Sequence, residues 1–159
     1  MALNNWRERL QECGDPELTG ALVRSIEALF QANLHALTVD AAERNIAHHL
    51  AGNIGRQGLM APDGRPWDVD VEYNRQGALV KTINGAQVVV PDVILHRINT
   101  EQNYLVIELK KGSSDQPDQA DLNKLQAYRQ QEPLLYRHAL FLRLGVGDDA
   151  GTLSCITWV

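Results

Sequence analysis

Val88-Val89-Val90-Pro91-Asp92-Val93-Ile94-Leu95 and Tyr104-Leu105-Val106-Ile107-Glu108-Leu109-Lys110 are the two stretches that decide the fold of this chain. Successive residues of a strand point to opposite faces, so Glu108 and Lys110 share one face with Val106. Leu105, Ile107 and Leu109, which alternate with these residues, are apolar and line the other face. Both faces are therefore apolar as far as Glu108, which predicts a central strand covered on both sides by other elements.

The acids in these two stretches predict a metal site. Asp92 interrupts an apolar run directly after Pro91, which cannot donate to a strand ladder and marks an edge, a bulge or a bend. If the two strands are neighbours, Asp92 and Glu108 can converge on one hard cation. Mg²⁺, with Mn²⁺ as a substitute, fits because it takes oxygen ligands and usually needs only one or two protein carboxylates.

Lys110 would then lie beside a metal-bound water molecule. There it could orient or deprotonate the water, or stabilise the charge that develops on a phosphate. The alternative interpretation is a buried cluster of ionised side chains with no chemistry, because structural ion pairs also occur at strand ends.

Glu43 is a third candidate carboxylate, at the start of a predicted helix over residues 41–54. It precedes Ala47, Leu50 and Ile54 at steps of four, three and four, and so lies on their apolar stripe. A first-turn acid is also favoured by the helix dipole alone. A carboxylate on the core side of a helix that packs on the sheet could, however, reach the same metal site.

The remaining patterns predict one domain of the α/β (α+β) class. Asp15 and Pro16 signal the N-cap and first residue of a long helix, and Gly55 is expected to end the helix that follows. Further expected elements are a helix at 4–12, strands at 67–74, 87–97 and 104–111, a helix at 118–131, and strands at 138–146 and 153–159. Polar connectors around 76–85 and 99–103 favour antiparallel pairing of the first three strands. A mixed sheet with helices on its faces buries this order of patterns, with residues 1–37 as a helical extension and 38–159 as the core.

This order of features resembles the PD-(D/E)xK phosphodiesterase superfamily, which includes many restriction endonucleases and repair nucleases. The resemblance covers about residues 38–145, and the stretch 67–75 is similar to a group of small bacterial members. It implies a restriction-endonuclease-like core in which Asp92 and Glu108 bind the metal and Lys110 is the catalytic lysine. Glu43 matches the helix acid that assists metal or water binding in family members.

The helix after the motif strand often contributes a polar or basic residue near the phosphate in this superfamily. Lys124 and Tyr128 lie on one face of the predicted helix and match that position, with Asp121 and Leu125 on the same side. An exposed amphipathic face explains them equally well. Lys111 could belong to a basic rim for phosphates, although scattered surface charge is the alternative.

Composition and charge limit the classes of protein that fit. The 44% hydrophobic and 22% charged residues are typical of a soluble globular protein, and no stretch approaches the roughly 20 apolar residues of a membrane helix. The polar start MALNNWRERL does not resemble a signal peptide, and Cys13 and Cys155 are expected to be reduced, so we expect a cytoplasmic protein. A net charge of −5 argues against a general nucleic-acid coat but is compatible with a nuclease.

The leading functional hypothesis is a Mg²⁺-dependent endonuclease that cleaves nucleic acid, with DNA as the expected substrate, through a metal-activated water. The alternative is a catalytically silent nuclease-fold protein that binds nucleic acid or a protein partner, for example as an accessory protein of a defence system. Such a small core has few surfaces for reading bases. A homodimer or a protein partner that supplies target recognition is therefore expected.

Overall fold

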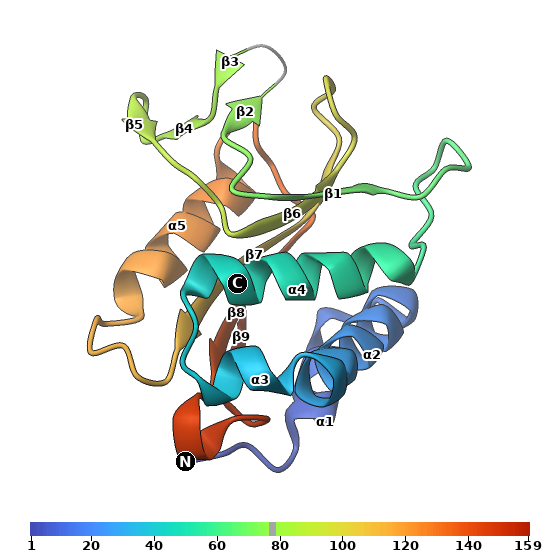
Figure 1. Cartoon of the computed structure of the whole chain (residues 1–159). Coiled ribbons are helices and arrows are strands. Elements are labelled where there is room, and N and C mark those ends of the chain that lie inside the picture. The colour runs from blue at the N-terminus through green and yellow to red at the C-terminus, as the bar shows by residue number, and fades with distance from the viewer. Residues whose placement is uncertain (77–78) are drawn as a thin grey trace.

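The computed structural model of the protein describes residues 1–76 and 79–159 and has a mixed α and β architecture (Figure 1). Gly77 and Ala78, part of the predicted connector at 76–85, lie outside the described residues. The strands are β1 (Asp68–Val71), β2 (Arg75–Gln76), β3 (Leu79–Val80), β4 (Thr82–Ile83), β5 (Gln87–Val88), β6 (Val93–His96), β7 (Asn103–Lys111), β8 (His138–Leu144) and β9 (Leu153–Trp158). The helices are α1 (Trp6–Leu10), α2 (Pro16–Ala32), α3 (Leu34–Thr38), α4 (Glu43–Arg56) and α5 (Gln119–Gln130), with 3₁₀ turns η1 (Gln11–Cys13) and η2 (Gly147–Asp149).

A five-stranded mixed sheet in the order β1-β6-β7-β8-β9 forms the centre of the molecule. β6 pairs antiparallel with β1 and with β7, as the polar connectors predicted. β7 and β8 are parallel, and α5 provides the crossover that a parallel pair requires. The carboxyl end of β7 therefore lies between the amino end of β6 and the carboxyl end of β8, and residues 112–118 lead from it to the start of α5.

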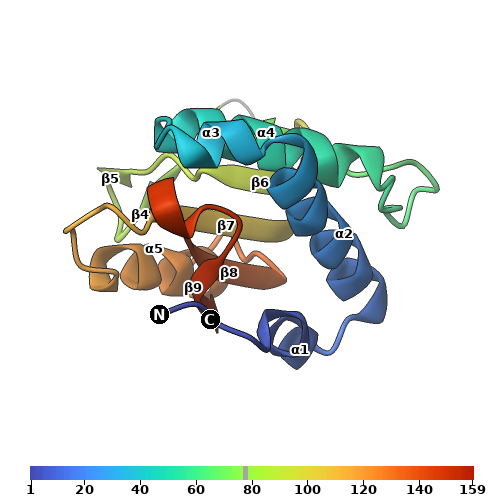
Figure 2. The same ribbon diagram turned by 60° about the horizontal axis from the view of Figure 1, so that its bottom comes forward.

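Helices cover both faces of the sheet, so the prediction of a doubly covered central strand is confirmed (Figure 2). Leu105, Ile107 and Leu109 belong to the core on the face of α2 and α4, whereas Val106 belongs to the core on the face of α5. The alternation of β7 thus assigns Glu108 and Lys110 to the α5 face.

The start of α2 follows the sequence prediction. Pro16 is its first residue, and the side chain of Asp15 accepts a hydrogen bond of 3.2 Å from the backbone N–H of Leu18. The predicted stop of the next helix at Gly55 is wrong, because α4 continues to Arg56. A Cβ at Gly55 would lie 4.0 Å from the side chain of Val69 in β1, an ordinary contact distance, so the helix continues through this glycine without strain. The left-handed residue after the helix is Gly58, with φ of 63°.

The strand predicted at 87–97 is also divided in the structure. Val93–His96 forms β6 of the central sheet, while Gln87–Val88 pairs with β4 in a separate hairpin. Pro91 lies between the two parts, where its missing N–H and fixed φ break the ladder. Within the described residues, no helix has the length and apolar content needed to cross a membrane.

Candidate active site

Asp92 and Glu108 lie next to each other, as the sequence predicted. Val93 of β6 is the register partner of Ile107 of β7, which places the residue before β6 opposite Glu108. The Oδ2 of Asp92 accepts a hydrogen bond of 2.8 Å from the backbone N–H of Leu109. We call Asp92 and Glu108 the carboxyl pair.

The carboxyl pair is buried, and its members repel each other. The side chain of Glu108 is only 2% exposed. Burial raises the pKa of Asp92, although the hydrogen bond from Leu109 opposes this effect. Burial and then the negative charge of Asp92 raise the pKa of Glu108 well above its ordinary value. A cation between the two groups would offset this repulsion.

Two lysines and a further acid extend the carboxyl pair into a charged cluster. Lys124 of α5 donates to Glu108 Oε2 at 2.9 Å and lies 3.1 Å from Asp121 Oδ1. Lys110 of β7 lies 2.6 Å from Asp121 Oδ2. Burial lowers the pKa of Lys124, but the charges and hydrogen bonds of Glu108 and Asp121 together outweigh burial, and the pKa is raised. The side chains therefore alternate in charge from Glu108 through Lys124 and Asp121 to Lys110.

Glu43 approaches the same region from α4. Its Oε1 accepts a hydrogen bond of 3.0 Å from the backbone N–H of Lys111, at the end of β7. Its charge is also one of the smaller influences that raise the pKa of Asp92. The ammonium of Lys111 is bound to Asp40 at 2.8 Å. Glu43 thus fixes the end of the motif strand and lies within electrostatic range of the carboxyl pair.

Within residues 1–76 and 79–159, two buried polar atoms in or beside the charged cluster have no hydrogen-bond partner, namely Glu108 Oε1 and the hydroxyl of Tyr128. Burial, followed by the charge of Glu108, raises the pKa of Tyr128. Buried polar atoms without a partner are rare and point to a missing water or ion. The donor set of two carboxylates, in which Glu108 contributes the oxygen without a partner, fits a hard cation such as Mg²⁺.

No larger metal-ligand group accompanies the carboxyl pair. Among residues 1–76 and 79–159, no three or more His, Cys, Asp or Glu side chains are grouped so that they could hold a metal ion. A cation at this position would therefore take two protein carboxylates, with water or substrate oxygens completing its coordination.

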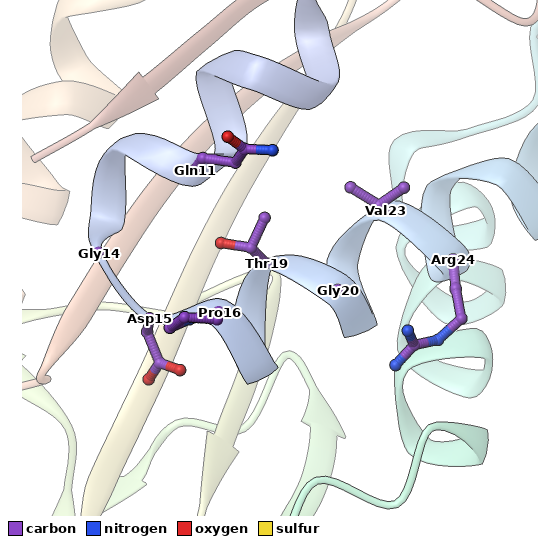
Figure 3. Close-up of a pocket in the computed structure, with 8 residues that line it drawn as sticks. All are labelled: Gln11, Gly14, Asp15, Pro16, Thr19, Gly20, Val23 and Arg24. Carbon is purple, nitrogen blue, oxygen red and sulfur yellow. The ribbon is translucent and has the colours of Figure 1, made fainter.

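One surface hollow lies away from the charged cluster. A hollow of about 500 Å³ lies between η1 and α2 and is lined by Gln11, Gly14, Asp15, Pro16, Thr19, Gly20, Val23 and Arg24 (Figure 3). None of the charged-cluster residues contributes to it. The buried charge, rather than the shape of the surface, identifies the candidate active site.

Asp121 is a member of the cluster for which the sequence predicts no role of its own. It lies on the same helix side as Lys124, three residues before it. An acid at that spacing from a lysine on a helix is a recognisable ion-pair signal. Its pairing with Lys110 depends on the packing of α5 against β7, which the local sequence does not contain.

Comparison of the chain with models of protein families, with curated proteins and with solved structures finds no match.

Proposed function

We propose that the protein is a metal-dependent phosphodiesterase with a restriction-endonuclease-like core, and that it cleaves nucleic acid, with DNA as its expected substrate. The observation that carries this proposal is the buried carboxyl pair of Asp92 and Glu108, in which Glu108 Oε1 lacks a partner among the residues that the structure describes. Burying two repelling acids is costly unless a cation or a proton compensates them. A divalent cation bound between the two acids would offset this cost, which would explain why both acids are buried.

The order of elements supports the same proposal. The chain has the features of the PD-(D/E)xK pattern in the same order. They are an acid on α4, an acid directly before β6, Glu108 and Lys110 on β7, and then the crossover helix α5. The structure also gives this arrangement a mixed sheet with helices on both faces.

Asp92 and Glu108 would hold the cation, which when bound would activate a water molecule for attack on phosphorus and offset the charge of the phosphate. Lys110 shares a strand face with Glu108, so its ammonium can donate to the attacking water or to a phosphate oxygen. Lys124, the more exposed of the two lysines, can donate to a second phosphate oxygen. Asp121 orients both ammonium groups through its two oxygens.

Incubation of the protein with supercoiled DNA, linear DNA and RNA, with Mg²⁺ or Mn²⁺ and with a chelator, tests the proposal. We expect metal-dependent cleavage that falls by about 100-fold or more in Asp92→Asn and Lys110→Met. Asp148→Asn removes an exposed acid on η2 and serves as a matched control that should retain full activity. Equal activity of Asp92→Asn, Lys110→Met and the wild type would overturn the proposal.

A catalytically silent binding protein is the second candidate, and one observation favours it. The two lysines of the cluster are already engaged in ion pairs with Glu108 and Asp121, so the cluster has compensating charges without a metal. Calorimetric titration with Mn²⁺ separates the two candidates. Absence of metal binding, with retained binding to DNA or to a protein partner, would favour the silent protein. If the protein elutes as a monomer, self-association is excluded as its route to target recognition.

A further inference from the structure

Arg143 of β8 makes an unusually complete set of hydrogen bonds close to the charged cluster. It is the register partner of Lys110 on the parallel strand β7, so the two cations lie side by side on the α5 face. Its guanidinium donates to the carbonyl oxygens of Lys111 at 3.1 Å, Ser114 at 3.0 Å and Gln116 at 3.1 Å. It also donates to Asp118 Oδ1 at 3.2 Å and 2.6 Å.

All of these acceptors belong to one segment, residues 111–118, which joins the end of β7 to the start of α5. The planar fork of a guanidinium can hold several oxygens in fixed directions, which a lysine ammonium cannot reproduce. Asp118 occupies the N-cap position of α5 but makes no capping bond with its side chain, because its carboxylate is turned to Arg143. Arg143 therefore fixes the path between the strand and the helix of the candidate active site.

Ion pairs hold the first half of α5 on the sheet. The buried side chains of this helix are Leu125, Ala127 and Tyr128, all in its second half, and only half-buried Leu122 packs on the core before them. Three ion pairs connect the earlier part to the sheet: Asp118 with Arg143, Asp121 with Lys110, and Lys124 with Glu108.

Two of these three ion pairs contain groups that the proposed chemistry needs. Binding of a cation by Glu108 weakens its contact with Lys124, and donation by Lys110 to water or phosphate weakens its contact with Asp121. The pair of Arg143 and Asp118 contains no such group. It is the connection that can stay intact while the other two change partners.

We propose that Arg143 is a positioning residue, which keeps the first half of α5 docked on the sheet while Glu108, Lys110 and Lys124 exchange partners during cleavage. This inference rests on the proposed function for its catalytic part. Among the described residues, the side-chain hydrogen bonds of Arg143 reach neither Asp92, directly before β6, nor Glu108 of β7. It acts on the lysines through the segment 111–118, and not on the metal ligands.

Cleavage kinetics and metal affinity give the first test. In Arg143→Met we expect kcat to fall by about 100-fold, because a displacement of the lysines by about 1 Å is sufficient for such a loss, with KM and the Mn²⁺ affinity changed by less than about threefold. Asp118→Asn removes the ion pair but keeps the three carbonyl contacts, so its loss should be smaller. Arg143→Lys should not restore the wild-type rate. An unchanged kcat in Arg143→Met, or a parallel loss of Mn²⁺ affinity, would overturn the positioning role.

Amide hydrogen exchange of metal-free protein gives a second test that does not depend on any activity. Glu108→Gln combined with Lys110→Met breaks the other two ion pairs. The amides of residues 122–124, which begin the hydrogen-bonded part of α5, should then remain protected through Arg143. Addition of Asp118→Asn, and more strongly of Arg143→Met, should raise the exchange rate of these amides by about tenfold or more while the amides of β8 and β9 stay protected. Loss of protection already in the first double variant would contradict the inference. If the wild type does not cleave nucleic acid, the proposed function is refuted. The exchange experiment then decides by itself whether Arg143 holds the first half of α5 on the sheet.

Discussion

The ammonium of Lys110 lies 2.6 Å from Oδ2 of Asp121, and both side chains are largely buried, at 10% and 13% exposure. The proposed catalytic lysine is thus held by an acid of the crossover helix rather than by the two acids of its own motif. Asp121 also lies 3.1 Å from Lys124, so one carboxylate compensates two ammonium groups. This relationship makes Asp121 a sensitive position for stability and for the geometry of the cluster.

Asp121→Asn should destabilise the protein by about 3 kcal/mol, because it leaves a buried lysine without its charged partner. Urea denaturation followed by circular dichroism measures the free energy of unfolding. Asp115→Asn removes an exposed acid from the neighbouring loop and should change this energy by less than about 0.5 kcal/mol. Equal stability of Asp121→Asn and the wild type would show that the ion pair with Lys110 does not contribute.

Glu108→Gln should make the metal-free protein more stable than the wild type above pH 4.5, and the advantage should grow as the pH rises further. Burial raises the pKa of Glu108 in the folded chain above its ordinary value of 4.5, so the folded wild type holds this proton more tightly than the unfolded chain. Its stability therefore falls as the pH rises from 4.5 through the folded pKa, and the glutamine variant escapes this loss. Melting temperatures of both proteins from pH 4 to pH 8, in chelator, measure the difference. A constant difference across that range would contradict the expectation.

Burial of Lys81 should make the stability of the wild type rise with pH, which is opposite to the effect of Glu108. It is fully buried, donates to the Tyr136 hydroxyl at 3.0 Å and to the Tyr73 carbonyl at 3.3 Å, and burial lowers its pKa from 10.5 to about 8. The unfolded chain binds more protons between these values, so the wild type gains stability as the pH rises from about 8 to 10.5. Lys81→Met lacks this gain, and its stability relative to the wild type should fall by about 3 kcal/mol over that range. Denaturation curves at pH 7.5 and 10.5 check this, and parallel changes in the two proteins would refute it.

Asp15 should contribute to stability through two separate bonds. One oxygen caps α2 at Leu18, and the other accepts a bond of 2.6 Å from the hydroxyl of Tyr104. Asp15→Ala removes both, with an expected loss of about 2–3 kcal/mol, whereas Asp15→Asn keeps a capping oxygen and should lose about half as much. Tyr104→Phe removes only the second bond and is the matched comparison. If all three variants unfold at the same denaturant concentration as the wild type, this account of Asp15 is wrong.

The sequence by itself determined the features that depend on neighbouring residues. Asp15 and Pro16 predicted the start of α2, because a cap and a fixed φ act within one turn of helix. The alternation in 104–110 predicted which side chains of β7 share a face, because the pleat of a strand has a period of two. The same reasoning brought Asp92 and Glu108 together, since short connectors favour antiparallel neighbours.

Local patterns failed where a contact from elsewhere in the chain decided the outcome. Gly55 has the sequence signature of a helix end, but α4, which packs on β1, continues through it to Arg56. The apolar run 87–97 has the signature of one strand, but Pro91 divides it between a hairpin and the central sheet.

Only the tertiary structure decided the partners of the charged side chains. Lys124 meets Glu108 and Asp121 meets Lys110 because the crossover between β7 and β8 lays α5 across the end of β7. Arg143 reaches the segment 111–118 because the parallel register places it beside Lys110. A charged side chain that is removed from water takes the nearest opposite charge that the packed elements offer, and that choice is set by the arrangement of the elements in space rather than by spacing along the chain.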